Sequence, residues 1–277
     1  MAIIDSPNQR RADDGGTDSF PMAGHSKWAN IKRQKARVDS KRGKIFAKVS
    51  REIIVAAKMG GGDPDGNFRL RTAIDKAKAV SFPNDNIERA IAKGCGVSAD
   101  GNDFESIRYE GYGPGGVAVL IEALTDNRNR SAADLRTAFG KNGGNLGETG
   151  CVGWMFDQKG VVTLLGDVEE ETLLEDALEA GAESYELVDE IDEDTPGAEV
   201  FCDISDLESV SAILKEKNYN IQEVDIRWIP SNTVKVEDPE IASSLLKMVD
   251  ALEESDDVQS VTANFDMTDE VLAQISD

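Results

Sequence analysis

The side chains that could contact a charged partner are cations, and they are densest near the N-terminus. Residues 22–60 hold eleven Lys and Arg but only two acids, which gives this stretch a net charge of +9 in a chain of net charge −23. A basic segment in an acidic chain is typical of proteins that bind a polyanion. The predicted phosphate contacts in this stretch are Lys27, Lys32, Arg33, Lys35, Arg37, Lys41, Arg42, Lys44, Lys48 and Arg51.

One aromatic residue, Trp28, stands inside this basic stretch. Its neighbours in the sequence include Lys27, Lys32 and Arg33. An indole ring among cations suits stacking on a base while the cations contact phosphates, so Trp28 is also a predicted nucleic-acid contact. The alternative is that Trp28 pins the segment to the core, because burying a tryptophan is a common way to anchor a chain.

A second polar group has the sequence TDNRNRS and follows an apolar run. Ser131 is predicted to cap the helix that begins there. The N-terminus of this helix could hold a phosphate together with Arg128 and Arg130. In the alternative interpretation, one of these arginines pairs with Asp126 or Glu122 and only stabilises the loop.

Residues suited to catalysis or metal binding are scarce. The single histidine, His25, lacks cysteines or carboxylates at ligand spacing, so no metal site is expected. No serine or cysteine stands in a nucleophile motif. The glycine-rich segments match neither a phosphate loop nor a dinucleotide fingerprint. We therefore expect a protein that is not an enzyme, with no catalytic residue, no metal and no cofactor.

Composition places the chain among globular cytoplasmic proteins. Its 277 residues, 40% of them apolar, are enough for two or three domains. No apolar run approaches the roughly 20 residues of a membrane span, and residues 1–21 lack the pattern of a secretory signal. The widely spaced Cys95, Cys151 and Cys202 indicate a reducing compartment without disulfides. We expect no membrane partner and no small-molecule substrate.

Charge divides the chain sharply. The net charge is −2 for residues 1–21, +9 for residues 22–100 and −30 for residues 101–277. Repulsion of the acidic part should orient the protein with its basic end toward a polyanion. Residues 1–21 have no usable periodicity and are predicted to be a disordered extension, with Met22 as an alternative start.

Helical periodicity dominates up to residue 100. In the segment 40–60, capped by Ser40, Lys44, Lys48 and Arg51 fall on one side of a helix and Ile53 and other apolar residues on the opposite side. We expect the apolar side to pack on a neighbouring helix and the basic side to stay free. Further helices are predicted over 68–80 and over 85–93, the latter capped by Asn84.

Strand patterns begin after residue 100. Strands are predicted over 107–112 and 116–124, a helix over 131–141, and a hairpin over 151–156 and 161–165. Next come a helix over 169–180, strands over 185–188 and 199–204, a helix over 207–216 and a strand over 221–229. The tail adds strands over 233–237 and 258–265 with a helix over 239–252.

These elements predict an α+β fold. An all-helical N-terminal domain precedes two α/β domains of the ferredoxin-like sandwich type, because the central elements follow the order β-α-β-β-α-β. The tail is incomplete alone and needs the strands that follow residue 101, so the third domain is inserted into the second. The predicted parts are a disordered extension (1–21), a basic helical domain (22–100), a middle domain (101–149 plus 231–277) and an inserted acidic domain (150–230).

Long motifs also resemble a known family. The segments AGHSKWANIKRQKARVDSKRGKIFAKVSREI, GGGDPDGNFRLRTAIDKAKA, YEGYGPGGVAVLIEALTDNRNRS and AFGKNGGNLGETGCVGWMF are similar to the YebC family. The resemblance runs from Met22 through nearly the whole chain and implies three domains, the first helical. It also implies a non-enzymatic, DNA-binding transcriptional regulator, although a mitochondrial relative is a translational activator and bacterial relatives assist ribosomes at proline runs. The extension before Met22 and the Arg33-Gln34 pair, where members often carry histidine, depart from the pattern.

The residues and the resemblance together predict a regulatory protein that binds nucleic acid through its basic N-terminal domain. No helix-turn-helix or zinc-finger pattern is present, so binding should be mostly to phosphates. Transcriptional regulation through DNA is the main hypothesis. A ribosome-associated translation factor that contacts ribosomal RNA or transfer RNA is the alternative.

Overall fold

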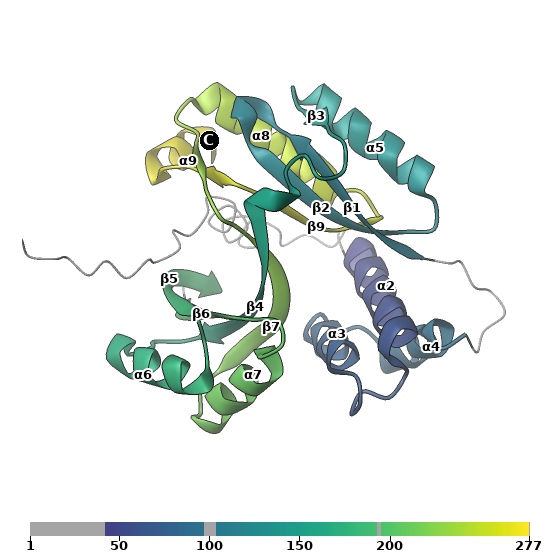
Figure 1. Ribbon diagram of the computed structural model, residues 1–277. Helices are drawn as coiled ribbons and strands as arrows, with labels where there is room; N and C mark the ends of the chain where they lie inside the picture. Colours follow the sequence, from purple (N-terminus) through teal and green to yellow (C-terminus); the bar gives the residue numbers. More distant parts are fainter. Residues whose placement is uncertain (1–41, 97–103, 193–194, 277) are drawn as a thin grey trace, which may run out of the picture.

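The computed structural model describes residues 42–96, 104–192 and 195–276. Within them the chain forms three groups of elements (Figure 1), which we call the helical, middle and inserted domains. The middle domain lies at the top of Figure 1, with the inserted domain below it on the left and the helical domain below it on the right. The predicted extension 1–21 lies outside the described residues.

The helical domain consists of α2 (Arg42–Gly60), α3 (Phe68–Ala79) and α4 (Asn84–Gly94). Their shared core includes Ile53, Ala56 and Leu70, so the predicted packing of the apolar side of α2 is confirmed. Asn67 caps α3 by accepting from the Leu70 N–H and donates to the Ala56 carbonyl, which ties two helices together. The small residues on this face let the helices approach closely.

The middle domain is a four-stranded sheet in the order β3-β1-β2-β9. Its antiparallel strands are β1 (Glu105–Tyr112), β2 (Ala118–Thr125), β3 (Asn145–Leu146) and β9 (Val258–Ala263). Helices α5 (Arg128–Lys141) and α8 (Pro239–Glu253) lie on the same side of the sheet in Figure 1. Leu135, Phe139 and Leu245 of these helices are fully buried in the core that they share with β2 and β9.

Short elements complete this domain. They are the 3-10 turns η2 (Pro114–Gly116) and η3 (Gly153–Met155), the parallel pair β8 (Val234–Lys235) and β10 (Phe265–Asp266), and helix α9 (Asp269–Ser276). The sequence analysis missed β3, the two 3-10 turns and α9. It also merged β9 and β10 into one strand, although Asn264 separates them and donates to the Asn232 side chain.

The inserted domain has a second four-stranded antiparallel sheet, in the order β5-β6-β4-β7. Its elements are β4 (Phe156–Leu165), α6 (Glu170–Ala180), β5 (Ser184–Asp192), β6 (Thr195–Cys202), α7 (Leu207–Glu216) and β7 (Ile221–Pro230). This order of elements and this strand order are those of a ferredoxin-like sandwich, so the predicted fold class is confirmed. The exact domain bounds stay a prediction.

The predicted strand over 151–156 is wrong, because a buried carboxylate takes the main-chain donors of this segment. Glu110 of β1 is 1% exposed. Its carboxylate accepts from the N–H groups of Gly150, Val152 and Gly153 at 2.9, 2.8 and 2.7 Å. These donors are therefore not available to a strand ladder, and the chain turns through η3 before β4 begins at Phe156.

Two predicted caps are also wrong. Helix α5 begins at Arg128, and its cap is Asn127, which accepts from the Arg130 N–H at 3.1 Å. Helix α4 begins at Asn84 itself, with Pro83 in the cap position and no side-chain cap bond. The fixed φ of Pro83 suits a helix start, and its main-chain carbonyl accepts from the N–H groups of Asn86 and Ile87.

None of the helices in the described parts of the chain is both long and apolar enough to cross a lipid bilayer.

Replacing Glu110 by Gln should destabilise the protein by about 2–4 kcal/mol, because an amide cannot accept all three N–H bonds and turns its own donors toward them. Burial raises the pKa of Glu110, but the three N–H bonds and Arg108 lower it more, and the net shift is downward. A depressed pKa stabilises the fold above the unfolded value of 4.5, and this contribution is lost as pH falls through the folded pKa.

Urea unfolding of wild type and Glu110→Gln, followed by circular dichroism, measures this difference. It should be largest near neutral pH and shrink below pH 4.5. Glu148→Gln, an exposed carboxylate in the same loop, is the matched control and should change little. Equal stability of the two variants at neutral pH would contradict the assigned role of Glu110.

Candidate nucleic-acid interface

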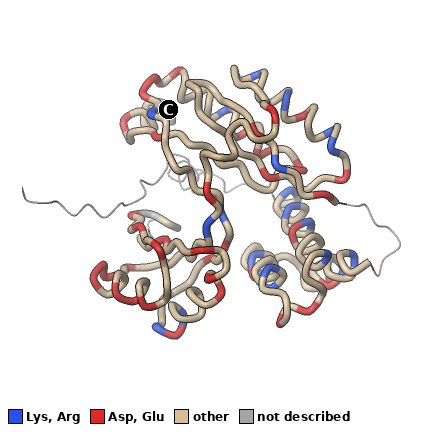
Figure 2. The backbone as a smooth tube through the Cα atoms, in the orientation of Figure 1, with Lys and Arg blue, Asp and Glu red and all other residues tan. Residues whose placement is uncertain are grey.

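Cations mark the helical domain in the charge map of the backbone (Figure 2), whereas acids prevail on the inserted domain. Residues 42–96 carry eleven Lys and Arg against six Asp and Glu. Several predicted contacts lie outside the described residues: Lys27, Trp28, Lys32, Arg33, Lys35, Arg37 and Lys41, together with the side chain of Arg42. The described candidates are those of α2 and of the start of α5.

Three predicted contacts on α2, Lys44, Lys48 and Arg51, lie against the end of α8. Lys44 Nζ donates to the Glu254 carbonyl at 3.2 Å, and Lys48 Nζ donates to the Glu253 carbonyl at 3.0 Å. Arg51 donates to the main-chain carbonyl of the residue just before Asp257. The prediction that the basic side of this helix stays free is therefore wrong for these three side chains.

The reason lies in the polarity of a helix end. The last carbonyls of a helix have no partner within the helix and carry partial negative charge, so they attract cations. Arg51 is further held by Asp257, 3.8 Å away, and its side chain is only 17% exposed. Its guanidinium also lies over the Phe104 ring, 5.8 Å from the centroid.

Asp257, at the start of β9, organises the loop that carries the predicted arginines. Its carboxylate accepts from the hydroxyls of Thr125 and Ser131 at 3.0 and 2.8 Å and from the Arg130 guanidinium at 2.8 Å. Burial raises the pKa of Asp257, but the bonds from Arg130, Ser131 and Thr125 lower it more, so the carboxylate is charged at neutral pH. Asp126 also pairs with Arg130 at 2.8 Å.

Arg130 thus forms ion pairs within the protein, as the second interpretation of this loop expects. Asp126 is the predicted partner, and Asp257 is an additional one. Arg128 is different, because its side chain is 68% exposed and its carboxylate neighbour, Glu105, lies 3.8 Å away and is exposed as well. The tertiary structure brings Lys44, Arg51 and Arg130 to the wall of one hollow of ≈ 770 Å³, where α2, α5 and the end of α8 meet. Carboxylates, Asp257 among them, line the same hollow.

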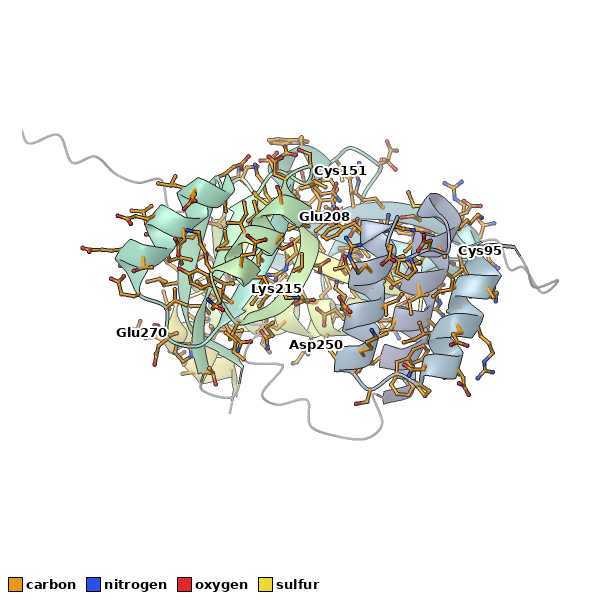
Figure 3. All side chains as sticks on the ribbon, turned by 90° about the horizontal axis from the view of Figure 1, so that it is seen from below. Cys95, Cys151, Glu208, Lys215, Asp250 and Glu270 are labelled. Atoms are coloured by element: carbon orange, nitrogen blue, oxygen red, sulfur yellow. The ribbon has the colours of Figure 1, made fainter. Side chains whose placement is uncertain are left out.

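A second group of ionised side chains joins the helical domain to the inserted domain. Lys76 Nζ of α3 lies 2.8 Å from Asp225 and 3.6 Å from Glu223, both on β7, and 3.7 Å from Glu52 on α2. Arg71 of α3 pairs with Glu208 of α7. Figure 3 labels Glu208, which lies on the side of the inserted domain that faces the helices.

Burial and the neighbouring charges together shift the pKa values of Glu52 and Lys76. Burial raises the pKa of Glu52, and the nearby Lys76 offsets this only in part. Burial lowers the pKa of Lys76, but Asp225, Glu52 and Glu223 raise it more, so the ammonium stays charged. The sequence analysis missed this group. The available signal was a cation, Lys76, next to the apolar stripe formed by Ala73 and Ala77.

This group lines a cavity of ≈ 530 Å³ to which all three domains contribute residues. Carboxylates outnumber cations along it, so it is a poor place for a phosphate backbone. Among the described residues, no group of three or more His, Cys, Asp and Glu is arranged to hold a metal ion. The three cysteines are free, and Figure 3 shows Cys95 and Cys151 on different parts of the molecule.

Comparisons with known proteins cover nearly the whole chain. Residues 26–97 match the model of the TACO1/YebC protein N-terminal domain, and residues 104–265 match that of the TACO1/YebC second and third domain. A protein of Gloeothece citriformis named "Probable transcriptional regulatory protein" is 66% identical over 253 residues, which cover 91% of this chain and 98% of that one. A relative of the same name from Trichodesmium erythraeum is 63% identical over 92% of this chain and 100% of its own.

A solved structure agrees in fold. The crystal structure of a conserved hypothetical protein from Aquifex aeolicus is 46% identical in sequence and superposes with a TM-score of 0.79. The match covers 89% of this chain and 99% of the other. Two family models together span more than half of the chain, so this protein belongs to the TACO1/YebC family.

Proposed function

We propose that this protein is a non-enzymatic transcriptional regulator that binds DNA through its basic N-terminal region. The observation that carries the proposal is the division of charge, +9 in residues 22–100 against −30 in residues 101–277. The names of the relatives support a regulatory role. A polyanion meets attraction at one end of this molecule and repulsion over the rest, which orients it on the helical domain.

The proposed contacts are mainly to phosphates. The candidates are the cations of residues 27–42, with Trp28 as a stacking residue, and the α2 side chains Lys44, Lys48 and Arg51. Arg128 is exposed and can add a contact, whereas Arg130 is engaged by carboxylates and contributes least. Lys and Arg on phosphates position a protein but do not read bases, so sequence preference should be weak.

We call the basic segment 27–41, which precedes α2, the arm. A triple variant reverses three of its charges: Lys32→Glu, Lys35→Glu and Arg37→Glu. It should bind a labelled DNA duplex about 100-fold more weakly than wild type at moderate salt. Loss of three phosphate contacts should also reduce the slope of log affinity against log salt by about 3. Fluorescence anisotropy over a salt series measures both quantities. These residues are chosen because the α2 cations also contact α8.

The matched control reverses three exposed lysines of the acidic domains, Lys215, Lys235 and Lys247. It changes net charge equally but should lower affinity only slightly. Equal losses in both variants would mean that general charge, and not the arm, governs binding, which would contradict the proposed site.

Scrambling the duplex sequence should change the affinity less than about tenfold, since phosphate contacts carry no sequence information. The same assay with a single-stranded RNA of equal length compares the two nucleic acids. A DNA duplex bound much more tightly than its scrambled version would contradict the phosphate-dominated mode. Binding of RNA alone would replace the DNA proposal with the ribosomal alternative.

A further inference from the structure

The α2 cations lie along one face of the helix and meet a matching row of oxygens. Lys44, Lys48 and Arg51 are spaced four and three residues apart, so they share a face. Lys44 and Lys48 donate to the main-chain carbonyls of the cap and the last residue of α8, and Arg51 donates to a carbonyl in the turn that follows. Arg51 is also paired with the Asp257 carboxylate. A phosphate backbone presents the same cations with a comparable series of oxygens.

The end of α8 is suited to imitate a polyanion. Its carbonyls carry the partial negative charge of a helix C-terminus. The last turn of α8 contains no basic residue to neutralise that charge. Glu253, Glu254, Asp256 and Asp257 add four carboxylates in the same segment.

We infer that this contact is autoinhibitory: the end of α8 occupies Lys44, Lys48 and Arg51 in a closed state, and nucleic acid must displace it to use them. The inference rests on the proposed function, because it concerns the same cations. One carbonyl bond does not use up the three donors of a lysine or the five of an arginine. A phosphate backbone is opposed instead by the end of α8 itself, whose carbonyls and carboxylates stand against these cations. The apparent affinity for nucleic acid is therefore lowered by the fraction of molecules that are open.

A second contact holds the helical domain against the inserted domain and so favours the closed state. Lys76 stands between Glu52 on its own domain and Glu223 and Asp225 on β7 of the inserted domain. Arg227 lies 4.0 Å from Glu223 and pairs with Glu199 at 2.6 Å. Without Lys76, the three carboxylates would face one another across the domain boundary and repel. Loss of this cation should favour opening and release α2 from α8.

This inference gives a test in which the expected change in nucleic-acid affinity is opposite to the change that loss of a positive charge alone would cause. Lys76→Gln removes a positive charge, which alone would weaken nucleic-acid binding. In the autoinhibited protein it should instead tighten the binding of a labelled single-stranded RNA or DNA duplex by about three- to tenfold. The control is Lys78→Gln on the same helix, whose side chain is 61% exposed and pairs only within α3. It should leave binding unchanged or slightly weaker.

A second measurement needs no nucleic acid. In the closed protein the partly buried Lys48 should react with an amine-acylating reagent several-fold more slowly than the exposed Lys78, as read by mass spectrometry of peptides. In Lys76→Gln the rate of Lys48 should rise toward that of Lys78. Thermal unfolding of each variant, followed by circular dichroism, verifies that the fold is retained.

The outcomes separate the two proposals. Fast acylation of Lys48 in wild type, or weaker binding by Lys76→Gln than by Lys78→Gln, would overturn the autoinhibition. Should Lys76→Gln fail to fold, the acylation rates of the wild type decide alone. Slow acylation without binding of any nucleic acid, even by folded Lys76→Gln, would overturn the proposed function and leave the contact a structural one.

Discussion

The attraction between the cations of α2 and the carbonyl end of α8 joins the helical domain to the rest of the molecule. It connects side chains with main-chain carbonyls 205 to 210 residues away in the sequence. Lys76 adds a second connection of the same kind to the inserted domain. The helical domain has its own apolar core. Phe68 of α3 also packs against the apolar core of the inserted domain. The position of the helical domain therefore depends on both charge and apolar contact, and the charged part is sensitive to a polyanionic competitor and to salt.

This arrangement gives the acidic domains a role. A net charge of −30 in residues 101–277 would otherwise only repel nucleic acid. In the structure, part of that charge is turned inward, where the end of α8 meets Lys44, Lys48 and Arg51. Weak, non-specific polyanions would compete poorly with an acceptor in the same molecule. A partner that engages the arm and α2 together could open the contact, which would raise selectivity without base-reading side chains.

Local patterns predicted most of the fold. The apolar side of α2, the limits of α7 and the β-α-β-β-α-β order all follow from periodicity within short windows. Two of the errors fell where a distant carboxylate binds the segment concerned. Glu110 reorganises residues 150–153, and Asp257 binds Ser131 away from a capping role. Neither contact has a local signal, because each joins segments that only the folded sheets bring together.

The candidate site shows the same limit. Composition identified the cations of α2 as a group, and helical spacing placed them on one face. Their contact with α8 could not be predicted, since it depends on how the domains dock and on main-chain carbonyls, which every sequence has. The sequence left Arg130 with two interpretations, a phosphate contact or a structural ion pair. In the structure it pairs with Asp126 and also with Asp257, which lies 127 residues away in the sequence.

The central claim is that nucleic acid binds the basic end of this protein and not its acidic domains. Ultraviolet cross-linking in living cells, followed by mass spectrometry of the linked peptides and sequencing of the bound nucleic acid, tests it most directly. The account predicts cross-links within residues 22–60 and none within residues 150–230, with DNA as the main linked species. Cross-links confined to the acidic domains, or no linked nucleic acid at all, would contradict it.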